Sequence, residues 1–290
     1  MNAGTRAPLV LGAVLVALVG CGGPSSSYVT STATPTAAAV RGERPGPDNT
    51  GVPAGVELED SDDLRITEDG AVVDGLDVDG CVVVDASDVT IRNTRIRCAD
   101  PGTANAVQVT SGSYDLVVED SEIDGLGRAD IGVGWNNYTL RRVEIHRTAD
   151  GVRLGSNTVI EDSWIHDLER QGSLHGDAVQ STSGSDILVR NNTLDSVTTE
   201  GGDLNNAAIM LGTETGEQRL ADARFEGNYL NGGNFTVNIR SDANLEDVVF
   251  TGNVYGPDHR YGPVRAPDDV SFDTDETAGG DAVEVQDSGS

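Results

Sequence analysis

The sequence predicts an all-β protein whose chain winds into one parallel β-helix of about eight coils. The first observation is an eight-residue pattern that recurs seven times, with start-to-start steps of 27, 22, 20, 29, 36 and 25 residues. A self-similar period in the twenties predicts a solenoid of stacked repeats. The second is that β-branched residues dominate and alternate with period two, without the 3.6-residue period of a helix. The third is composition, because 36 Gly residues and 4% aromatics suit many turns and a thin aromatic core. Leucine-rich repeats share the period, but they carry repeated Leu and frequent helices.

Each repeat begins with a strand-forming window that is apolar at its third and eighth positions. Inward side chains of such coils stack on their equivalents about 4.8 Å away. The sixth position holds Asn192, Asn228 and Asn253 in the last three windows. A column of buried Asn can pair amide to amide and so avoid the cost of desolvation. A weaker copy occupies Leu64–Val78. The windows are VTIRNTRI (Val89–Ile96), LVVEDSEI (Leu116–Ile123), YTLRRVEI (Tyr138–Ile145), TVIEDSWI (Thr158–Ile165), ILVRNNTL (Ile187–Leu194), ARFEGNYL (Ala223–Leu230) and VVFTGNVY (Val248–Tyr255).

A second strand follows each window, and aligning these strands places polar residues in columns. A one-residue slip in this register would move a side chain to the other face of its strand. The first column is predicted to hold Asn105, Asp130, Asp150, Asp177, Ala207 and Phe235. The second is predicted to hold Gln108, Val133, Arg153, Gln180, Met210 and Asn238.

Composition divides the chain into four predicted segments. Residues 1–21 carry Arg6, an apolar stretch and Leu18-Val19-Gly20-Cys21, which is similar to a lipobox, so we expect a lipoprotein signal peptide with Cys21 acylated. The alternative is a plain secreted protein. Residues 22–50 are predicted to be a flexible linker, 51–266 the β-helix and 267–290 an acidic disordered tail.

Charge and compartment limit the partners. All 19 basic residues are Arg, and 48 Asp and Glu bring the net charge to −29. Such a surface repels nucleic acid and anionic lipid, so we expect no nucleic-acid partner, membrane contact through the lipid anchor only, and a monomer. Clustered carboxylates permit Ca²⁺, although no cofactor is specified. Outside the cytoplasm, Cys81 and Cys98 can form a disulfide if their Cα atoms lie close enough, which the sequence leaves open.

The windows, the Asn column and the segment IEDSWIHDL followed by HGDAVQSTSGSDILVRNNTLD resemble the right-handed parallel β-helix proteins of the pectate-lyase-like superfamily. More narrowly, they resemble secreted bacterial β-helix-repeat proteins. The resemblance covers about Gly51–Ala266 and implies a right-handed coil. Members include polysaccharide lyases, polygalacturonase-type hydrolases, uronan C5-epimerases and proteins without catalysis, so fold alone does not fix function. The paired Asp-Asp and Gly-His-Gly motifs of the hydrolases are absent, and the lack of Lys leaves only Arg as a lyase-type base.

The candidate site centres on His175-Gly176-Asp177, which has a distant likeness to the His and Asp of the epimerases. Removal of a C5 proton from a uronic acid needs a base beside that carbon and a cation beside the carboxylate. We therefore expect a lyase or epimerase-like enzyme acting on a uronic-acid-containing polysaccharide. His175 is the predicted base, Asp177 its orienting group, and Arg153 or Arg240 the carboxylate partner. Asp150, Gln180, Asn238 and Gln108 are predicted to bind the sugar, and Trp135 to stack on it.

Less specific interpretations stay open for the same residues. The alternative function is a non-catalytic carbohydrate-binding or cell-envelope module, or a structural rod. Asp150 and Asp177 also suit turn caps that accept backbone N–H groups. His146 and His166 occupy equivalent repeat positions and are best explained as a solvated ladder, because two His residues alone specify little about a metal.

Overall fold

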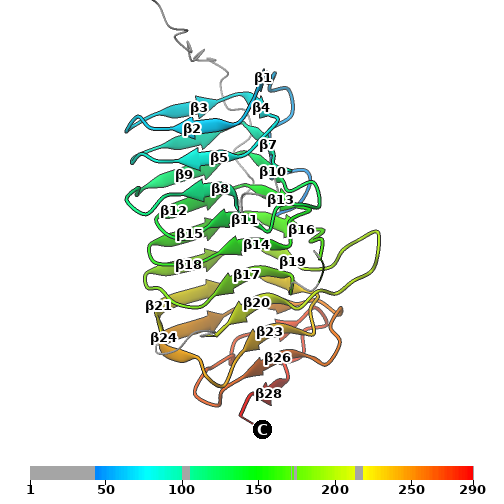
Figure 1. The fold of residues 1–290 in the computed structure, drawn as a ribbon. Helices are drawn as coiled ribbons and strands as arrows, with labels where there is room; N and C mark the ends of the chain where they lie inside the picture. Colours follow the sequence, from blue (N-terminus) through cyan, green and yellow to red (C-terminus); the bar gives the residue numbers. More distant parts are fainter. Residues whose placement is uncertain (1–42, 100–104, 171, 173–174, 213–217, 290) are drawn as a thin grey trace, which may run out of the picture.

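The computed structural model describes residues 43–99, 105–170, 172, 175–212 and 218–289. These residues form three parallel sheets stacked along one rod, and no helix occurs among them (Figure 1). Each coil visits sheet A, then sheet B, then sheet C, so that the chain winds as the predicted right-handed parallel β-helix. None of the residues placed by the structure belongs to a helix that is long and apolar enough to cross a bilayer.

The described strands are distributed as follows. Sheet A contains β1 (Glu59–Ser61), β4 (Leu76–Val78), β7 (Arg95–Arg97), β10 (Glu122–Asp124), β13 (Glu144–His146), β16 (Trp164–His166), β19 (Thr193–Asp195), β22 (Tyr229–Asn231), β25 (Val254–Tyr255) and β27 (Glu276–Thr277). Sheet B contains β2 (Leu64–Ile66), β5 (Val82–Val84), β8 (Asn105–Val109), β11 (Ile131–Gly134), β14 (Asp150–Arg153), β17 (Asp177–Ser181), β20 (Ala207–Leu211), β23 (Phe235–Ile239), β26 (Gly262–Ala266) and β28 (Val285–Asp287). Sheet C contains β3 (Val72–Asp74), β6 (Thr90–Arg92), β9 (Leu116–Glu119), β12 (Tyr138–Arg141), β15 (Thr158–Glu161), β18 (Ile187–Arg190), β21 (Arg219–Glu226) and β24 (Asn244–Thr251).

The two predicted apolar columns form the core. Third-position residues stack in sheet C, where Leu140 pairs with Val118 on one side and Ile160 on the other. Eighth-position residues stack in sheet A, where Ile145 lies between Ile123 and Ile165. All these side chains are fully buried. The recurring window therefore places its third and eighth residues in continuous apolar columns, as the sequence predicts, although the steps between windows vary in length.

The predicted Asn column is a hydrogen-bonded ladder at the corner between sheets C and A. Asn228 Oδ1 accepts from the backbone N and from Nδ2 of Asn192, both at 3.0 Å. Asn228 Nδ2 donates to Val189 O and to Asn253 Oδ1, both at 2.9 Å. The ladder continues to Asp275, whose Oδ1 accepts from the backbone N of Asn253 at 3.0 Å. Each buried amide is thus satisfied by its neighbours, which removes its desolvation penalty.

The predicted register is wrong by one residue at β11. Asp130 and Val133 were expected in the outward columns, but Ile131 pairs with Asn105 and Asp150, and Gly134 pairs with Gln108. Val133 instead lies fully buried between Val107 and Val152. Burial of this β-branched side chain decides the register, because a slip would expose it.

The acidic segment 267–290, expected to be disordered, is folded in its described part, 267–289. Strand β27 pairs with β25, and β28 pairs with β26. Phe272 is 6% exposed and packs on Phe250, with ring centroids 4.8 Å apart. Composition misled the prediction because the backbone edges of β25 and β26 need partners. A few apolar residues, Val270, Phe272 and Val283, close the core over them.

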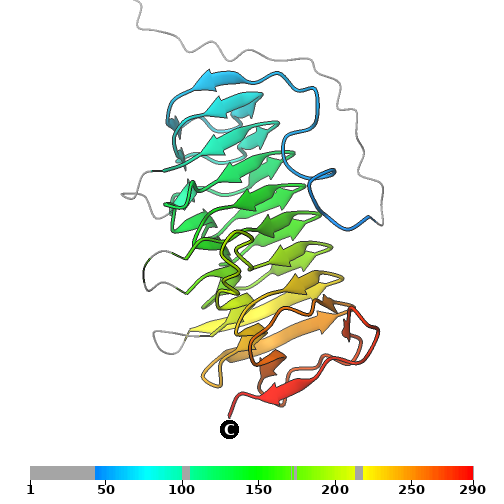
Figure 2. The same ribbon diagram turned by 90° about the vertical axis from the view of Figure 1, so that its right-hand side faces the viewer.

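The N-terminal strap, residues 43–51, lies along the outside of sheet A (Figure 2). Thr193 Oγ1 donates to the carbonyl oxygen of the buried Pro45 at 2.7 Å, and the Arg44 guanidinium lies 3.1 Å from the centre of the Tyr229 ring. Gly51 N donates to Arg142 O at 3.0 Å. The end of the predicted linker is therefore docked on the β-helix. The predicted signal peptide, Cys21 and residues 22–42 lie outside the described residues.

Cys81 and Cys98 form a disulfide, with their Cα atoms 4.7 Å apart. Cys81 directly precedes β5 and Cys98 directly follows β7. The bond therefore joins two neighbouring coils near the N-terminal end of the rod.

Candidate functional site

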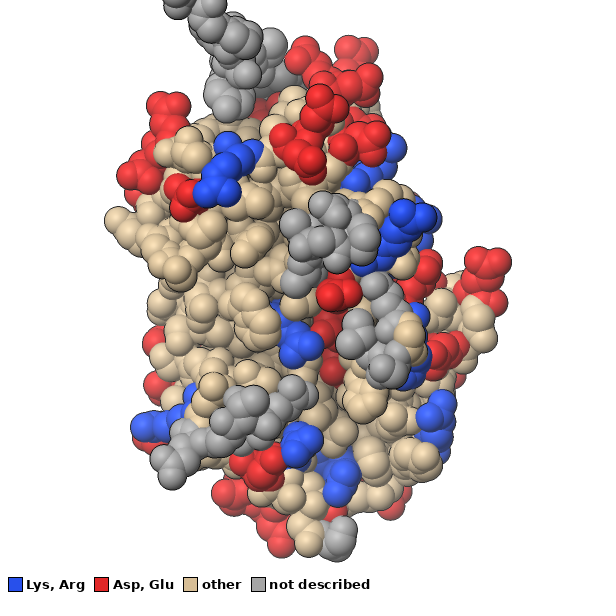
Figure 3. Space-filling model, in the orientation of Figure 1, with Lys and Arg blue, Asp and Glu red and all other residues tan. Residues whose placement is uncertain are grey.

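A cavity of about 690 Å³ opens on the outer face of sheet B. Figure 3 views this face and shows acidic and basic side chains gathered on it. Seven of the nine predicted catalytic and sugar-binding residues line the cavity, while Gln108 and Trp135 lie outside it. The seven are Asp150, Arg153, His175, Asp177, Gln180, Asn238 and Arg240.

Stacking of equivalent positions on β14, β17, β20, β23 and β26 builds the cavity floor. Arg153 pairs with Gln180, and Gln180 with Met210. Met210 pairs with Asn238, and Asn238 with Arg265. We call this outward row the sheet B column. Its neighbouring members are about 4.8 Å apart along the rod, so a ligand lying along the column meets a new side chain at each coil.

Asp150 lies at the base of the cavity and is 3% exposed. Its Oδ1 accepts from the backbone N of Asp177 at 2.9 Å, and its Oδ2 forms an ion pair with Arg153 Nη2 at 2.5 Å. The predicted turn-cap role is therefore correct for Asp150. Burial raises its pKa to about 6, and this effect outweighs the opposing charge of Arg153. The folded protein therefore holds the proton of Asp150 more tightly than water does.

Asp177 and His175 lie one coil further along the chain. Asp177 is 1% exposed and its Oδ1 accepts from Asn206 Nδ2 at 2.8 Å. His175 precedes β17 and is exposed on the cavity wall. The cavity is thus lined by the exposed imidazole of His175 and by the buried carboxylate of Asp177, which Asn206 holds in place.

Three arginines line the cavity, and each has a different partner. Arg153 binds Asp150, and Arg240 grips Asp242 through Nε at 2.9 Å and Nη2 at 2.7 Å. Arg265 Nη2 donates to the carbonyl oxygen of Ser288 at 3.2 Å. Within the described ranges Arg265 makes no ion pair, so its charge is the most available to an acidic ligand. Arg153 Nε and Asn238 Oδ1 are buried atoms without a hydrogen-bond partner among the placed residues, and they offer the cavity a donor and an acceptor.

Five polar residues of the cavity were absent from the predicted site. Arg265 is the next member of the sheet B column after Asn238, so extending the predicted column by one coil would have found it. Asn206 directly precedes β20, and Asp242 follows Arg240 by two residues. Asp130 belongs to the coil where the register slipped. The five are Asp130, Asn206, Ser241, Asp242 and Arg265.

Gln108 and Trp135 line a second cavity, of about 420 Å³, which we call the Trp135 cavity. Trp135 is 43% exposed, and the Arg153 guanidinium carbon lies 5.5 Å from the centre of its indole ring. Arg153 lines the larger cavity and contacts this ring, so it marks the boundary between the two.

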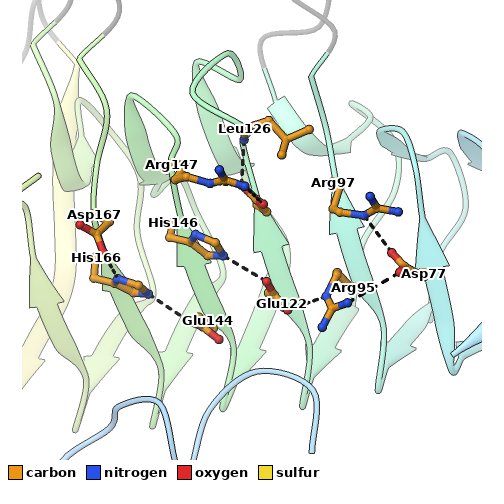
Figure 4. A network of polar contacts seen from close by, with 11 residues as sticks. Asp77, Arg95, Arg97, Glu122, Leu126, Glu144, His146, Arg147, His166 and Asp167 are labelled. Carbon is orange, nitrogen blue, oxygen red and sulfur yellow. Dashed lines mark hydrogen bonds and ion pairs between the residues drawn. The ribbon is translucent and has the colours of Figure 1, made fainter. Parts of the chain in front are cut away.

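A separate polar cluster covers sheet A, on the other side of a coil corner (Figure 4). Asp124 pairs with His146, and His146 with His166, which confirms the predicted ladder. His146 Nε2 contacts Glu122 Oε1 at 3.2 Å, and His166 Nε2 contacts Glu144 Oε1 at 3.1 Å. The His146 contact is the first cause lowering the pKa of Glu122, which falls to about 2. Burial lowers the pKa of His146, but Glu122 and nearby carboxylates outweigh burial and raise it overall.

This cluster is best explained as structural. One ligand atom each from Glu122, Asp124 and His146 lies within 4.8 Å of the others, which is compatible with a cation site. However, Arg95 donates to Glu122 at 2.7 Å, and Arg147 forms an ion pair with the buried Asp124. Because guanidinium groups already neutralise both carboxylates, the ladder needs no metal to be stable.

Comparisons of this chain with protein-family models, with curated proteins and with solved structures find no match. The functional inference therefore depends on the geometry and chemistry of the two cavities.

Proposed function

We propose that this protein binds a uronic-acid-containing polysaccharide on the outer face of sheet B and acts on it as a lyase or C5-epimerase-like enzyme. The observation that carries the proposal is the meeting of His175, Asp150 and three arginines around one cavity of about 690 Å³. We also propose that the chain belongs with the pectate-lyase-like β-helix proteins and works as a monomeric lipoprotein tethered outside the cytoplasm.

The cavity supplies the groups that proton abstraction requires. His175 takes the C5 proton, and the electron pair of the broken C–H bond spreads into the substrate carboxyl group. Arg265, with Arg153 and Arg240 nearby, stabilises the charge that develops there. Asn238 and Gln180 bind hydroxyl groups along the sheet B column. An acid and a base with separated environments are the combination that such chemistry uses.

Asp150 is the proposed proton donor in the last step of either reaction. In a lyase, the C4–O4 bond breaks, a C4=C5 double bond forms, and the departing O4 receives the Asp150 proton. In an epimerase, C5 regains a proton from the opposite face and no bond to O4 breaks. A pKa of about 6 leaves Asp150 partly protonated near neutral pH and suits it to either proton donation.

Ca²⁺ has no evident place at Asp150. In the ionised carboxylate, one oxygen accepts from Asp177 N and the other pairs with Arg153, so a cation there would have to displace Arg153. When Asp150 donates its proton, the oxygen that faces Arg153 must carry it, which requires Arg153 to turn to the substrate carboxylate.

A non-catalytic carbohydrate-binding module is the second candidate. It is favoured by the internal pairing of two cavity arginines, Arg153 with Asp150 and Arg240 with Asp242. Such pairs fix the shape of a binding surface without leaving those cations free for a reacting carboxylate.

Hydrogen exchange at C5 distinguishes the two candidates. The purified chain is incubated in D₂O with polygalacturonate, alginate and hyaluronan, and loss of the H5 signal is followed by NMR together with absorbance of the unsaturated uronide. We expect exchange with at least one polymer, and its loss in His175→Ala. His259→Ala is the matched control, because His259 lies in a loop away from both cavities. Binding without exchange would support the non-catalytic module, and activity that survives in His175→Ala would refute the assignment of the base.

A further inference from the structure

We propose that the glycan is a heteropolymer in which a neutral sugar adjoins an acidic one, with the neutral unit in the Trp135 cavity and the acidic unit in the larger cavity. This inference depends on the proposed function, because it names the class of polysaccharide that the same face of sheet B selects.

The two cavities differ sharply in charge. Eight residues lining the larger cavity are ionisable, whereas none of the residues lining the Trp135 cavity is. A carboxylate moved from water into a cavity without a cation loses hydration that nothing there replaces. The nearest cation is Arg153, 5.5 Å from the centre of the Trp135 ring, and its charge is already paired with Asp150. A uronate is therefore disfavoured in the Trp135 cavity, while a neutral sugar loses nothing of this kind. The Trp135 cavity is lined by Gln108, Val109, Thr110, Ser111, Trp135, Asn136 and Asn137.

The Trp135 cavity has the chemistry of a neutral-sugar site. Trp135 is 43% exposed, so part of its indole is open to a ligand. An indole offers a flat apolar surface to the C–H face of a pyranose. The exposed amide of Gln108 and the hydroxyl of the exposed Ser111 can exchange hydrogen bonds with the sugar rim.

The two cavities are close enough for adjacent units of one chain. Gln108 pairs with Gly134, and a Cβ built on Gly134 would lie only 3.3 Å from the Arg153 Cβ. The chain is closely packed at this point, and Arg153 both lines the larger cavity and contacts Trp135. Two coil steps separate Gln108 from Arg153, about 10 Å along the rod, so neighbouring units of one glycan can reach both cavities.

The charge of the whole molecule supports the same substrate class. At a net charge of −29, the surface repels a polyanion along its whole length. Alternating neutral units halve the number of carboxylates brought near this surface. The arginines of the larger cavity then need to compensate only the acidic units that enter it.

The test compares a homouronan with alternating glycans. Dissociation constants of the full chain are measured by calorimetry for polygalacturonate, hyaluronan and unsulfated chondroitin oligosaccharides of equal length, at one ionic strength. We expect tighter binding of an alternating glycan, and about a tenfold loss of that affinity in Trp135→Ala, the size typical of removing a buried aromatic anchor. Trp135→Phe should restore part of the affinity. Tyr114→Ala is the matched control, since Tyr114 is 54% exposed and lines neither cavity.

Each outcome decides between the proposals. Unchanged urea unfolding of Trp135→Ala shows that a loss of affinity comes from the lost contact. If polygalacturonate binds at least as tightly as both alternating glycans and Trp135→Ala weakens none of them, the heteropolymer inference is wrong while the proposed function stands. If none of the three acidic glycans binds, both proposals are wrong.

Discussion

Replacement of Asp150 by Asn tests the proton donor of the larger cavity through folding stability. Burial raises the pKa of Asp150 from 3.8 to about 6, which means that the folded protein holds this proton more tightly than the unfolded chain does. The stability contributed by this group is therefore fully present below pH 3.8 and is lost as the pH rises through 6. The difference between the two pKa values corresponds to about 3 kcal/mol.

The assay is urea unfolding of the wild type and Asp150→Asn between about pH 4 and pH 7.5. Wild-type stability minus variant stability should fall by about 2–3 kcal/mol over this range, because Asn cannot titrate. The exposed Asp268→Asn controls for the loss of one surface carboxylate, which solvent screens. Parallel curves for wild type and Asp150→Asn would show that burial does not control this carboxyl group, and its role as proton donor would have to be abandoned.

Three further predictions concern the rod itself. Asn228→Ala leaves two N–H donors of Asn192 and the carbonyl oxygen of Val189 without their hydrogen-bond partner. We expect urea unfolding to show a free energy of unfolding lower by about 3–5 kcal/mol, and almost no change for the exposed Asn244→Ala. Equal losses in the two variants would refute the role of the ladder. The double variant Cys81→Ser/Cys98→Ser removes a link between residues 17 positions apart, so its free energy of unfolding should be lower by about 2–4 kcal/mol. A reducing agent should lower the free energy of unfolding of the wild type to the same level. His146→Gln should destabilise more at pH 5.5 than at pH 8, because a raised histidine pKa gives stability that disappears as the pH rises; an equal loss at both would contradict the ion pair with Glu122.

The repeat made much of the fold and of the larger cavity predictable. The recurring window and the strand alternation determine which residues stack. Residues far apart in the chain, such as Arg153 and Gln180, are therefore predicted side by side from the sequence alone. The same logic separated inward columns such as Ile123, Ile145 and Ile165 from outward ones. Local pattern and tertiary structure coincide here because each coil contacts only its neighbours.

Where contacts do not follow the repeat, prediction failed. The one-residue error in the predicted register at β11 arises because Val133 is buried in the core. The aligned strand sequences give no sign of this burial. The last coil forms because Phe272 and Asp275 complete a core and a ladder begun elsewhere, despite an acidic composition. The strap depends on a bond between Pro45 and Thr193, 148 residues apart, for which the sequence contains no periodic counterpart.

The docked strap changes how the rod responds to mechanical load. Stacked coils come apart most easily from an open end, where a coil has only one neighbour. Tension applied to the chain ahead of residue 43 first meets Arg44 and Pro45 on β22 and β19, deep within the stack, and reaches β1 only after these contacts break. We therefore expect the strap to transfer such a force to the interior coils, so that the terminal coil is not the first to unfold.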